Sequence, residues 1–580
     1  MKLPGLFLFC LLPFLLCSQT NLLHTNPLAE SILLGNYNGA QYAAATPTPL
    51  NPAELGLDLQ ARIKSDSLKA YLFHMNTYRT RNSGSDTLSS TNGIGAARRW
   101  VYNKFQDFSA EVNNRLIVSY FQFNQTICAV GQHRNIVAIL PGADPANNGV
   151  VLVEGHIDSR CEVLCDTACL AKGIEDNATG TALVMELARV MSKYQYQYTI
   201  VFMVTIGEEQ GLVGAGAYAT YALQKNIPIK AVLNNDVIGG IICGQTASPP
   251  ACPGLNNIDS TSVRLFSSGN FNAKSKQLAR FIKLQYRENI LPTATVPMNV
   301  RIMSPEDRTG RGGDHIPFRE KGYAAMRFTS ANEHGDASAG PTYTDRQHST
   351  RDILGEDTDG NSSIDSFFVD FNYLQRNATI NANAAAIAAR AVPAPPEFTG
   401  TRSGSNLTVN FNPALGNNES VRIALRSTTN DWDTVYTITG GANALVPCNA
   451  TGGLFVSLAR VDADGAESLF GVEKIITTSA VQDADQGKDA PNIRLFQNRP
   501  NPFDEATWIS FWIEKLPTYQ KANMLILDMQ GKMIQTIPLN LKQGLNEILY
   551  THGYGMQGTF VYLLEIDGLP IDSRQMIFAN

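Results

Sequence analysis

The sequence has no long run of basic residues, and beyond its first twenty positions it has no apolar run of about 18 residues or more. The first absence argues against a nucleic-acid partner, because such surfaces gather Lys and Arg. The second argues against a transmembrane segment in the mature chain. Charged residues make up only 17% of the 580 residues, and the formal net charge is −6. Hydrophobic residues make up 44%, enough to bury large cores, so a mostly disordered chain is excluded.

The first 19 residues have the three parts of a secretory signal peptide. Lys2 supplies the positive start, Leu6 to Leu16 form an apolar stretch that is too short to span a membrane, and small residues follow. We therefore expect residues 1–19 to be removed and the mature protein to be exported. Residues 20–55 are rich in Asn, Ala, Thr and Pro, and we expect them to form a loose leader or propeptide-like segment.

Export bears on the cysteines, because oxidising compartments permit disulfides. Seven cysteines follow the signal segment: Cys128, Cys161, Cys165, Cys169, Cys243, Cys252 and Cys448. Cys243 and Cys252 could close a small loop, and we expect one or two of the triplet Cys161, Cys165 and Cys169 to be disulfide-bonded. A zinc site on that triplet is the weaker alternative, since no fourth ligand lies nearby. With an odd number of cysteines, at least one stays free.

Residues 56–392 alternate between strand and helix patterns. A helical pattern begins near Leu57, another covers residues 95–108, and a third covers 181–193; apolar strand patterns occur at residues 135–141, 150–154, 199–206 and 231–237. This alternation predicts an α/β fold, a phosphorylase/hydrolase-like sandwich with a mixed, mostly parallel central sheet.

Two β-rich segments follow the α/β region. A proline-rich linker at Pro393 precedes residues 396–476, whose short alternating strands loosely resemble a fibronectin type III-like β-sandwich. A second linker at 482–492 precedes residues 493–580, which have the pattern of another small β-sandwich. The sequence therefore predicts two small β domains after the α/β domain.

The residues with catalytic chemistry lie between positions 150 and 352. Each follows a predicted strand or lies on a loop: His156, Asp158, Asp176, Glu208, Glu209, Asp236 and His348. In open α/β sheets, ligands bind at the carboxyl ends of the strands. Two histidines, three carboxylates and a spare glutamate satisfy the needs of a two-metal hydrolase, in which a carboxylate lies between the ions and a base serves the water.

The five motifs GHID, EDNATG, GEEQG, NNDVIGG and QHSTRD are separated by 20, 33, 27 and 112 residues, counted between their metal-ligand candidates. In this order they resemble the zinc aminopeptidase and glutamate carboxypeptidase family, peptidase family M28. The resemblance covers roughly residues 60–390. It implies two Zn²⁺ ions, of which His156 and Asp236 bind one, Glu209 and His348 bind the other, and Asp176 bridges them.

The same resemblance implies roles for the neighbouring residues. Glu208 would be the general base, and Asp158 would hold His156 and fix its tautomer. Asp352 would give similar support near His348. His315, in the stretch GRGGDHIPF, would lie on the substrate side.

Residues 493–580 also resemble a known family. The QNRPNPF start, the D-x-x-G-K turn at Asp528, Gly531 and Lys532, and the G-T-F-V-Y strand from Gly558 to Tyr562 are similar to the C-terminal sorting domain of the type IX secretion system. The resemblance implies passage across a bacterial outer membrane, the secretion machinery as a partner, and a secreted or cell-surface location.

The sequence therefore predicts an exported di-zinc exopeptidase that acts on peptides or proteins, most simply as an aminopeptidase. One alternative is a glutaminyl cyclase-type transferase, which resembles the same motifs but uses one zinc. Another is a carboxypeptidase in which Arg308 and Arg311 bind a terminal carboxylate. A non-catalytic binding protein is disfavoured, because all five ligands and Glu208 are present.

Calcium is a separate expectation. Asp357, Asp359 and Asn361 alternate in EDTDGNSSID, and calcium sites gather such oxygen ligands. A solvated acidic turn is the alternative.

Overall fold

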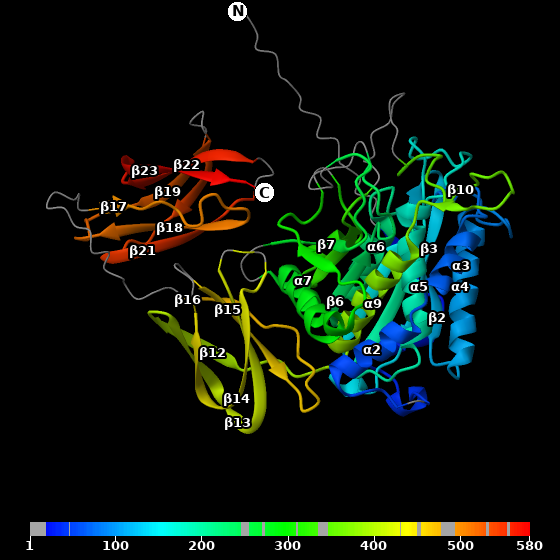
Figure 1. Ribbon diagram of the computed structural model, residues 1–580, viewed down its shortest axis with the longest axis horizontal. Helices are drawn as coiled ribbons and strands as arrows, with labels where there is room; N and C mark the ends of the chain where they lie inside the picture. The colour runs from blue at the N-terminus through cyan, green and yellow to red at the C-terminus, as the bar shows by residue number, and fades with distance from the viewer. Residues whose placement is uncertain are drawn as a thin grey trace, which may run out of the picture.

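The computed structural model describes most of the chain after the expected signal segment (Figure 1). The described ranges are 19–45, 47–244, 254–269, 273–308, 311–333, 346–427, 429, 431–448, 454–476, 493–528, 533–553 and 557–579. Across these ranges we find no helix with the length and apolarity needed to cross a membrane. Residues 1–18 of the expected signal peptide lie outside the described residues.

A nine-stranded sheet forms the centre of the α/β domain. Across the sheet the strands are β1 (Thr20–His24), β2 (Ile117–Ile127), β3 (Val130–Leu140), β5 (Thr199–Thr205), β4 (Val150–His156), β6 (Ile229–Asn235), β9 (Ala325–Ser330), β7 (Ser262–Ser267) and β8 (Asn299–Ile302). β4 runs parallel to β5 and β6, and β9 runs parallel to β6. The strands β1, β2 and β3 at one side pair antiparallel. The predicted mixed sheet with a parallel centre is confirmed.

Helices cover both faces of this sheet, which explains why its central strands are mostly apolar and buried along their whole length. One face carries α3 (Ser65–Met75), α4 (Gly93–Glu111), α5 (Thr179–Met191), α9 (Phe371–Ala388), α2 (Pro52–Arg62) and α7 (Lys274–Gln285). The other carries α6 (Val213–Gln224) and α8 (His315–Glu320). β4 and β5 are buried at every residue, and Figure 1 shows α5 and α9 lying along the sheet.

The loose conformation expected for residues 20–55 is wrong. β1 pairs antiparallel with β2 as an edge strand of the central sheet. The helix α1 (Pro27–Leu33) then buries Ala29, Ile32 and Leu33 in the main core. Composition misled here, because a few apolar residues at the correct spacing are enough to pair a strand and bury a short helix.

The cysteine expectations need a similar correction. Cys128 is bonded to Cys165, and Cys161 to Cys169. All three cysteines of the triplet are therefore oxidised, which also removes them as thiolate ligands for zinc. Cys243 is disulfide-bonded, and Cys252 lies outside the described residues. Among the described cysteines, Cys448 is free and buried.

The middle β unit consists of strands β12 (Glu397–Ser403), β13 (Asn406–Arg426), β14 (Thr434–Pro447), β15 (Leu454–Val461) and β16 (Lys474–Ile476). The first half of β13 pairs with β12 and the end of β14, whereas its second half pairs with the start of β14 and with β15. Strands that pass from one half to the other thus enclose the apolar core of this unit. Its likeness to fibronectin type III stays a prediction.

The middle unit packs against the α/β domain. Trp432 and Phe470, with ring centroids 4.0 Å apart, belong to the same buried cluster as the α/β core. At the rim, Arg422 pairs with Glu288 at 2.6 Å.

The C-terminal unit has two sheets around one core. One contains β17 (Ile493–Leu495), β18 (Ala506–Ile513) and β21 (Gly544–Thr551); the other contains β20 (Met533–Pro538), β19 (Ala522–Asp528), β22 (Gly558–Ile566) and β23 (Leu569–Phe578). The two sheets make a small β domain, as predicted. Of the D-x-x-G-K turn, Gly531 and Lys532 lie outside the described residues.

Candidate metal centre

The predicted ligands meet at one edge of the sheet because three parallel strands end there. His156 is the last residue of β4, Glu208 and Glu209 follow β5, and Asp236 follows β6. Asp176 lies in the irregular turn Ile174–Ala178 that leads into α5. The first turn of α5 requires glycine at position 180, because a Cβ on Gly180 would overlap the carbonyl oxygen of Asn235. A glycine thus lets α5 approach the end of β6 and brings Asp176 to the sheet edge.

The first ligand group consists of His156, Asp176 and Asp236. His156 Nε2 lies 3.2 Å from Asp176 Oδ1 and 3.4 Å from Asp236 Oδ1. Arg327 donates from Nε to the carbonyl oxygen of Asp236 at 2.6 Å and lies 3.2 Å from its Oδ2. The arginine therefore holds the far side of Asp236 while its Oδ1 faces the histidine.

The second ligand group consists of Asp176, Glu209 and His348. His348 Nε2 lies 3.0 Å from Asp176 Oδ2 and 3.1 Å from Glu209 Oε2. Asp176 thus directs one carboxylate oxygen to each histidine. The structure brings all five predicted ligands into two groups that share one aspartate.

The donor set fits zinc, which binds imidazole nitrogen and carboxylate oxygen. His156 Nε2 is buried and has no hydrogen-bond partner, although two carboxylates face it. Burial raises the pKa of Asp176, but the two imidazoles of His156 and His348 beside its carboxylate outweigh burial and hold that pKa well below its usual value. The shared aspartate is therefore ionised, as a bridging ligand must be.

Glu208 lies beside both groups on the wall of a pocket. Burial raises the pKa of the Glu208 carboxyl well above its ordinary value, despite the opposing charge of His156. A carboxylate with a raised pKa is a stronger proton acceptor.

Asp158 supports the site through two sets of atoms. His156 Nδ1 lies 3.1 Å from the main-chain oxygen of Asp158, an acceptor that places the proton on Nδ1 and leaves Nε2 for a metal. The carboxylate accepts the backbone N–H groups of Glu208 at 3.3 Å and Glu209 at 3.2 Å. Asp158 therefore fixes the tautomer of His156 through its carbonyl, while its side chain holds the loop of the expected base.

Asp352 contacts the turn that carries Asp176, and not His348 as expected. It accepts the backbone N–H of Glu175 at 2.8 Å and that of Asp176 at 3.0 Å. The expected support of His348 is therefore wrong, and Asp352 holds the turn of the shared aspartate.

Arg81 was not predicted from the sequence, and it is fully buried behind the site. It donates from Nε to the carbonyl oxygen of Ile157 at 2.7 Å and from Nη2 to that of Gly173 at 2.8 Å. Arg81 therefore ties the loop after His156 to the loop before Asp176. No motif marks it, because its contacts join segments distant in the sequence.

The pocket beside the two groups has a volume of about 280 Å³. Besides metal-ligand candidates and Glu208, its lining consists of Arg160, Gly211, Leu212, Arg308, Arg311, Gly312 and Arg327. Arg308 is buried and paired with Asp307 at 3.2 Å and with Glu333. Its charge is therefore neutralised, which removes one of the two arginines of the carboxypeptidase alternative.

His315 does not line this described pocket. It is fully buried at the start of α8, and its Nε2 lies 3.1 Å from the carbonyl oxygen of Glu306. These contacts are structural, so we give His315 no role in the reaction.

The acidic loop forms a third group, of Asp357, Asp359 and Asp365, all exposed. Asn361, which the alternating pattern included, donates instead to Asp359 Oδ2 at 3.0 Å. Calcium there stays a prediction.

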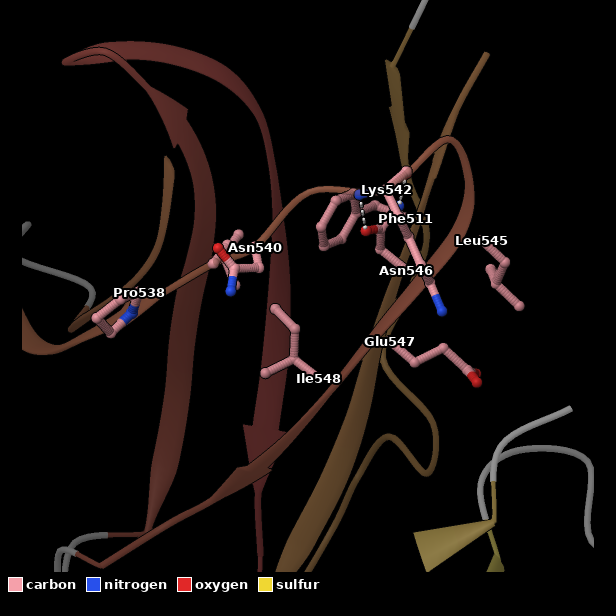
Figure 2. A pocket seen from close by; sticks show the side chains of 9 residues that line it. Phe511, Pro538, Asn540, Lys542, Leu545, Asn546, Glu547 and Ile548 are labelled. Carbon is pink, nitrogen blue, oxygen red and sulfur yellow. Dashed lines mark hydrogen bonds between the residues drawn. The ribbon is translucent and has the colours of Figure 1, made fainter. Parts of the chain in front are cut away.

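A second pocket, of about 350 Å³, lies in the C-terminal unit beside the edge strand β21 (Figure 2). Its lining includes Phe511, Asn540, Lys542 and Asn546. Asn546 accepts the backbone N–H of Lys542 at 3.0 Å and donates to its carbonyl oxygen at 2.7 Å. The Asn546 amide thus holds the backbone at Lys542 in place. None of the predicted catalytic residues lines this pocket.

Comparison with known proteins agrees with this geometry. Residues 135–364 match the model of peptidase family M28. A probable zinc metalloprotease of Leptosphaeria maculans is 30% identical over 331 residues, which cover 55% of this chain and 73% of that protein. One of Pyricularia oryzae is 31% identical over 354 residues, 58% of this chain and 67% of that protein. The solved LapA aminopeptidase of Legionella pneumophila is 20% identical, covering 57% of this chain and 74% of that one, with a TM-score of 0.40.

Two histidine–carboxylate groups around a shared aspartate, at the ends of parallel strands, fit the metal centre of a zinc metallopeptidase. The chain belongs to peptidase family M28.

Proposed function

We propose that this protein is an exported di-zinc exopeptidase that removes N-terminal residues from peptides or proteins. The observation that carries the proposal is Asp176, whose two oxygens face His156 and His348 separately. A two-metal site needs such a shared carboxylate. The relatives named as probable zinc metalloproteases support zinc as the metal.

In this proposal His156 and Asp236 hold one zinc ion, Glu209 and His348 hold the other, and Asp176 bridges them. When bound, zinc supplies Lewis acidity, which favours deprotonation of water and stabilises charge on the carbonyl oxygen. Glu208 accepts the proton from water at its carboxylate and donates it to the departing amine. Asp158 keeps the Glu208 loop in place through the backbone bonds described above.

In the carboxypeptidase alternative, Arg308 and Arg311 would bind a terminal carboxylate. A terminal carboxylate needs a cation that is available for it. Arg308 already pairs with Asp307 and Glu333, and Arg327 pairs with Asp236 and Asp307. Arg308 and Arg327 are therefore compensated by carboxylates of the chain itself. Arg311 also lines the pocket, and its Nη1 has no hydrogen-bond partner among the described residues, so the substrate assay decides between the two activities.

Zinc content and substrate class test the proposal together. The chain without residues 1–19 is saturated with zinc, analysed for bound metal, and assayed on aminoacyl-anilides, on peptides with a blocked N-terminus, and on peptides with an N-terminal glutamine. We expect two zinc ions per chain, hydrolysis of the anilides and of peptides with a free N-terminus, and no cleavage of the blocked peptides. One zinc ion with cyclisation of glutamine would identify the transferase. Hydrolysis of the blocked peptides from their C-terminus would identify a carboxypeptidase.

We also propose that the protein is secreted or attached to the surface of a bacterium with an outer membrane, with the type IX secretion machinery as its partner. The Cys128–Cys165 and Cys161–Cys169 disulfides support an oxidising destination. Resemblance of residues 493–580 to a sorting domain supports the route. Fusing residues 493–580 to a reporter protein and following its appearance outside a bacterium with type IX secretion tests this; retention of the fusion in the periplasm would contradict it.

A further inference from the structure

Arg160 contacts both ligands that are specific to the second zinc group. Its Nε donates to Glu209 Oε2 at 2.8 Å, and its Nη2 lies 2.7 Å from His348 Nδ1. The side chain is only 10% exposed, on the wall of the pocket. One guanidinium therefore acts on both residues at once.

The contact with His348 determines the tautomer of the imidazole. A guanidinium carries donors and no acceptor, so His348 Nδ1 must accept. A neutral imidazole that accepts at Nδ1 carries its proton on Nε2. His348 Nε2 lies 3.0 Å from Asp176 Oδ2 and 3.1 Å from Glu209 Oε2, so this proton is directed at the two carboxylates. Binding zinc through Nε2 requires the opposite tautomer, whose Nδ1–H would face an N–H of Arg160.

The contact with Glu209 also opposes the binding of a metal ion at the second group. Arg160 binds Oε2, the oxygen that also faces His348 Nε2, whereas Glu209 Oε1 is buried without a hydrogen-bond partner. The Arg160 guanidinium is therefore hydrogen-bonded to the Glu209 oxygen that would bind the metal ion.

The first group is arranged in the opposite way. His156 Nδ1 faces the carbonyl oxygen of Asp158 at 3.1 Å, so its Nε2 is ready to bind a metal. Arg327 contacts Asp236 Oδ2 at 3.2 Å and leaves Oδ1 facing His156. Each group thus has an arginine, but only Arg160 contacts the carboxylate oxygen that faces the histidine of its group.

We propose that Arg160 competes with the second zinc ion for Glu209 and His348. The inference rests on the proposed di-zinc function and deepens it. The first group binds zinc tightly, and the second binds it only as the guanidinium leaves Glu209 and His348. Arg160 is thus a positioning residue, acting through the two ligands and setting the zinc concentration at which the second site fills.

Zinc affinity of the second site tests this directly. The full chain without residues 1–19 is stripped of metal and titrated in zinc buffers, with bound zinc counted at each free concentration. We expect two steps for the wild-type protein. Arg160→Met should strengthen the second step by about 10- to 100-fold, the range typical of groups that contact metal ligands, and leave the first unchanged. Arg160→Lys, which keeps the charge but not the planar fork, should give a smaller gain.

Arg319→Met is the matched control. Arg319 lies on α8 and is also paired with a carboxylate, that of Glu306, at 2.6 Å. Neither Arg319 nor Glu306 lines the described pocket, so both steps should match the wild type.

A spectroscopic measurement reports the tautomer independently of affinity. The chain has 8 histidines, and nitrogen-15 labelling of histidine resolves protonated from unprotonated ring nitrogens. In the metal-stripped wild type, the resonance that His348→Gln removes should be protonated at Nε2. In Arg160→Met it should gain protonation at Nδ1.

The outcomes separate the inference from the proposed function. An unchanged or weaker second step in Arg160→Met overturns the inference while leaving a di-zinc enzyme intact. If Arg160→Met does not fold, the wild-type titration decides: two sites of equal, tight affinity overturn the inference. Absence of zinc binding at both groups overturns the proposed function, and the inference falls with it.

Discussion

Asp352 Oδ2 accepts the backbone N–H of Asp176 at 3.0 Å, and so a carboxylate that binds no metal itself holds the residue shared by both ligand groups. Its other oxygen accepts the N–H of Glu175 at 2.8 Å. The two bonds fix the turn Ile174–Ala178, whose backbone departs from regular helix. The position of the shared carboxylate therefore depends on a residue 176 positions further along the chain.

Asp352→Asn should weaken zinc binding by about 10- to 100-fold, the range typical of groups that orient metal ligands. The amide keeps one acceptor oxygen, but its NH₂ group faces the second backbone N–H. Competition with a chelator measures the affinity. Asp370→Asn is a matched control, since Asp370 accepts the N–H of Tyr373 at 2.8 Å at the start of α9. Unchanged zinc affinity in Asp352→Asn would contradict the role given to this carboxylate.

His24 makes stability depend on pH. Burial lowers the pKa of its imidazole from 6.5 to about 3, and the rings of Phe121 and Tyr221 have centroids 5.4 Å from its own. Because the folded-state pKa lies below the unfolded value, the native state resists protonation. The stabilisation is complete above pH 6.5 and is lost as the pH falls from 6.5 towards 3, by up to about 1.4 kcal/mol per pH unit.

His24→Leu should remove this contribution, since both ring nitrogens are buried without hydrogen-bond partners. Thermal unfolding at pH 7.5 and at pH 5 measures the effect in both proteins. The wild type should lose more stability on acidification than the variant. Equal losses would show that His24 is not the group responsible, and would argue against the pairing of β1 with the sheet.

The two disulfides should stabilise the α/β domain unequally. Cys128–Cys165 closes a loop of 37 residues and Cys161–Cys169 a loop of 8. Longer loops lose more entropy on cross-linking, and a disulfide typically contributes about 2–4 kcal/mol. Replacing Cys128 and Cys165 by Ala should therefore lower the midpoint of urea unfolding more than replacing Cys161 and Cys169. The reverse order would contradict the chain-entropy explanation.

The strand pattern in the sequence predicted much of the site. The apolar strands that end at His156, before Glu208 and before Asp236 are parallel and adjacent, so their ends meet at one edge. His348 comes from a loop more than a hundred residues after Asp236, and only the resemblance placed it with the others. Periodicity gives no position for a loop residue.

The residues that sequence reasoning missed act across distant segments. Arg160 follows the GHIDS stretch directly, so its nearness to the site could have been noticed, but its contact with His348 depends on the fold. Arg81 and Arg327 lie outside every motif, and their donors meet main-chain oxygens of Ile157 and Asp236. Such contacts leave no pattern in a sequence, because any backbone carbonyl can accept them.

Hydrolysis by Glu208→Ala at saturating zinc tests whether Glu208 is the general base of a di-zinc peptidase. Glu208 lies beside both ligand groups without belonging to either, so its loss should spare zinc binding. Glu320→Ala, at an exposed position of α8, is the control. Glu208→Ala should retain two zinc ions and lose about 10²- to 10⁴-fold in kcat on aminoacyl-anilides, the range typical of a positioned acid–base group. A variant that retains both zinc ions and hydrolyses the anilides at the wild-type rate would contradict it.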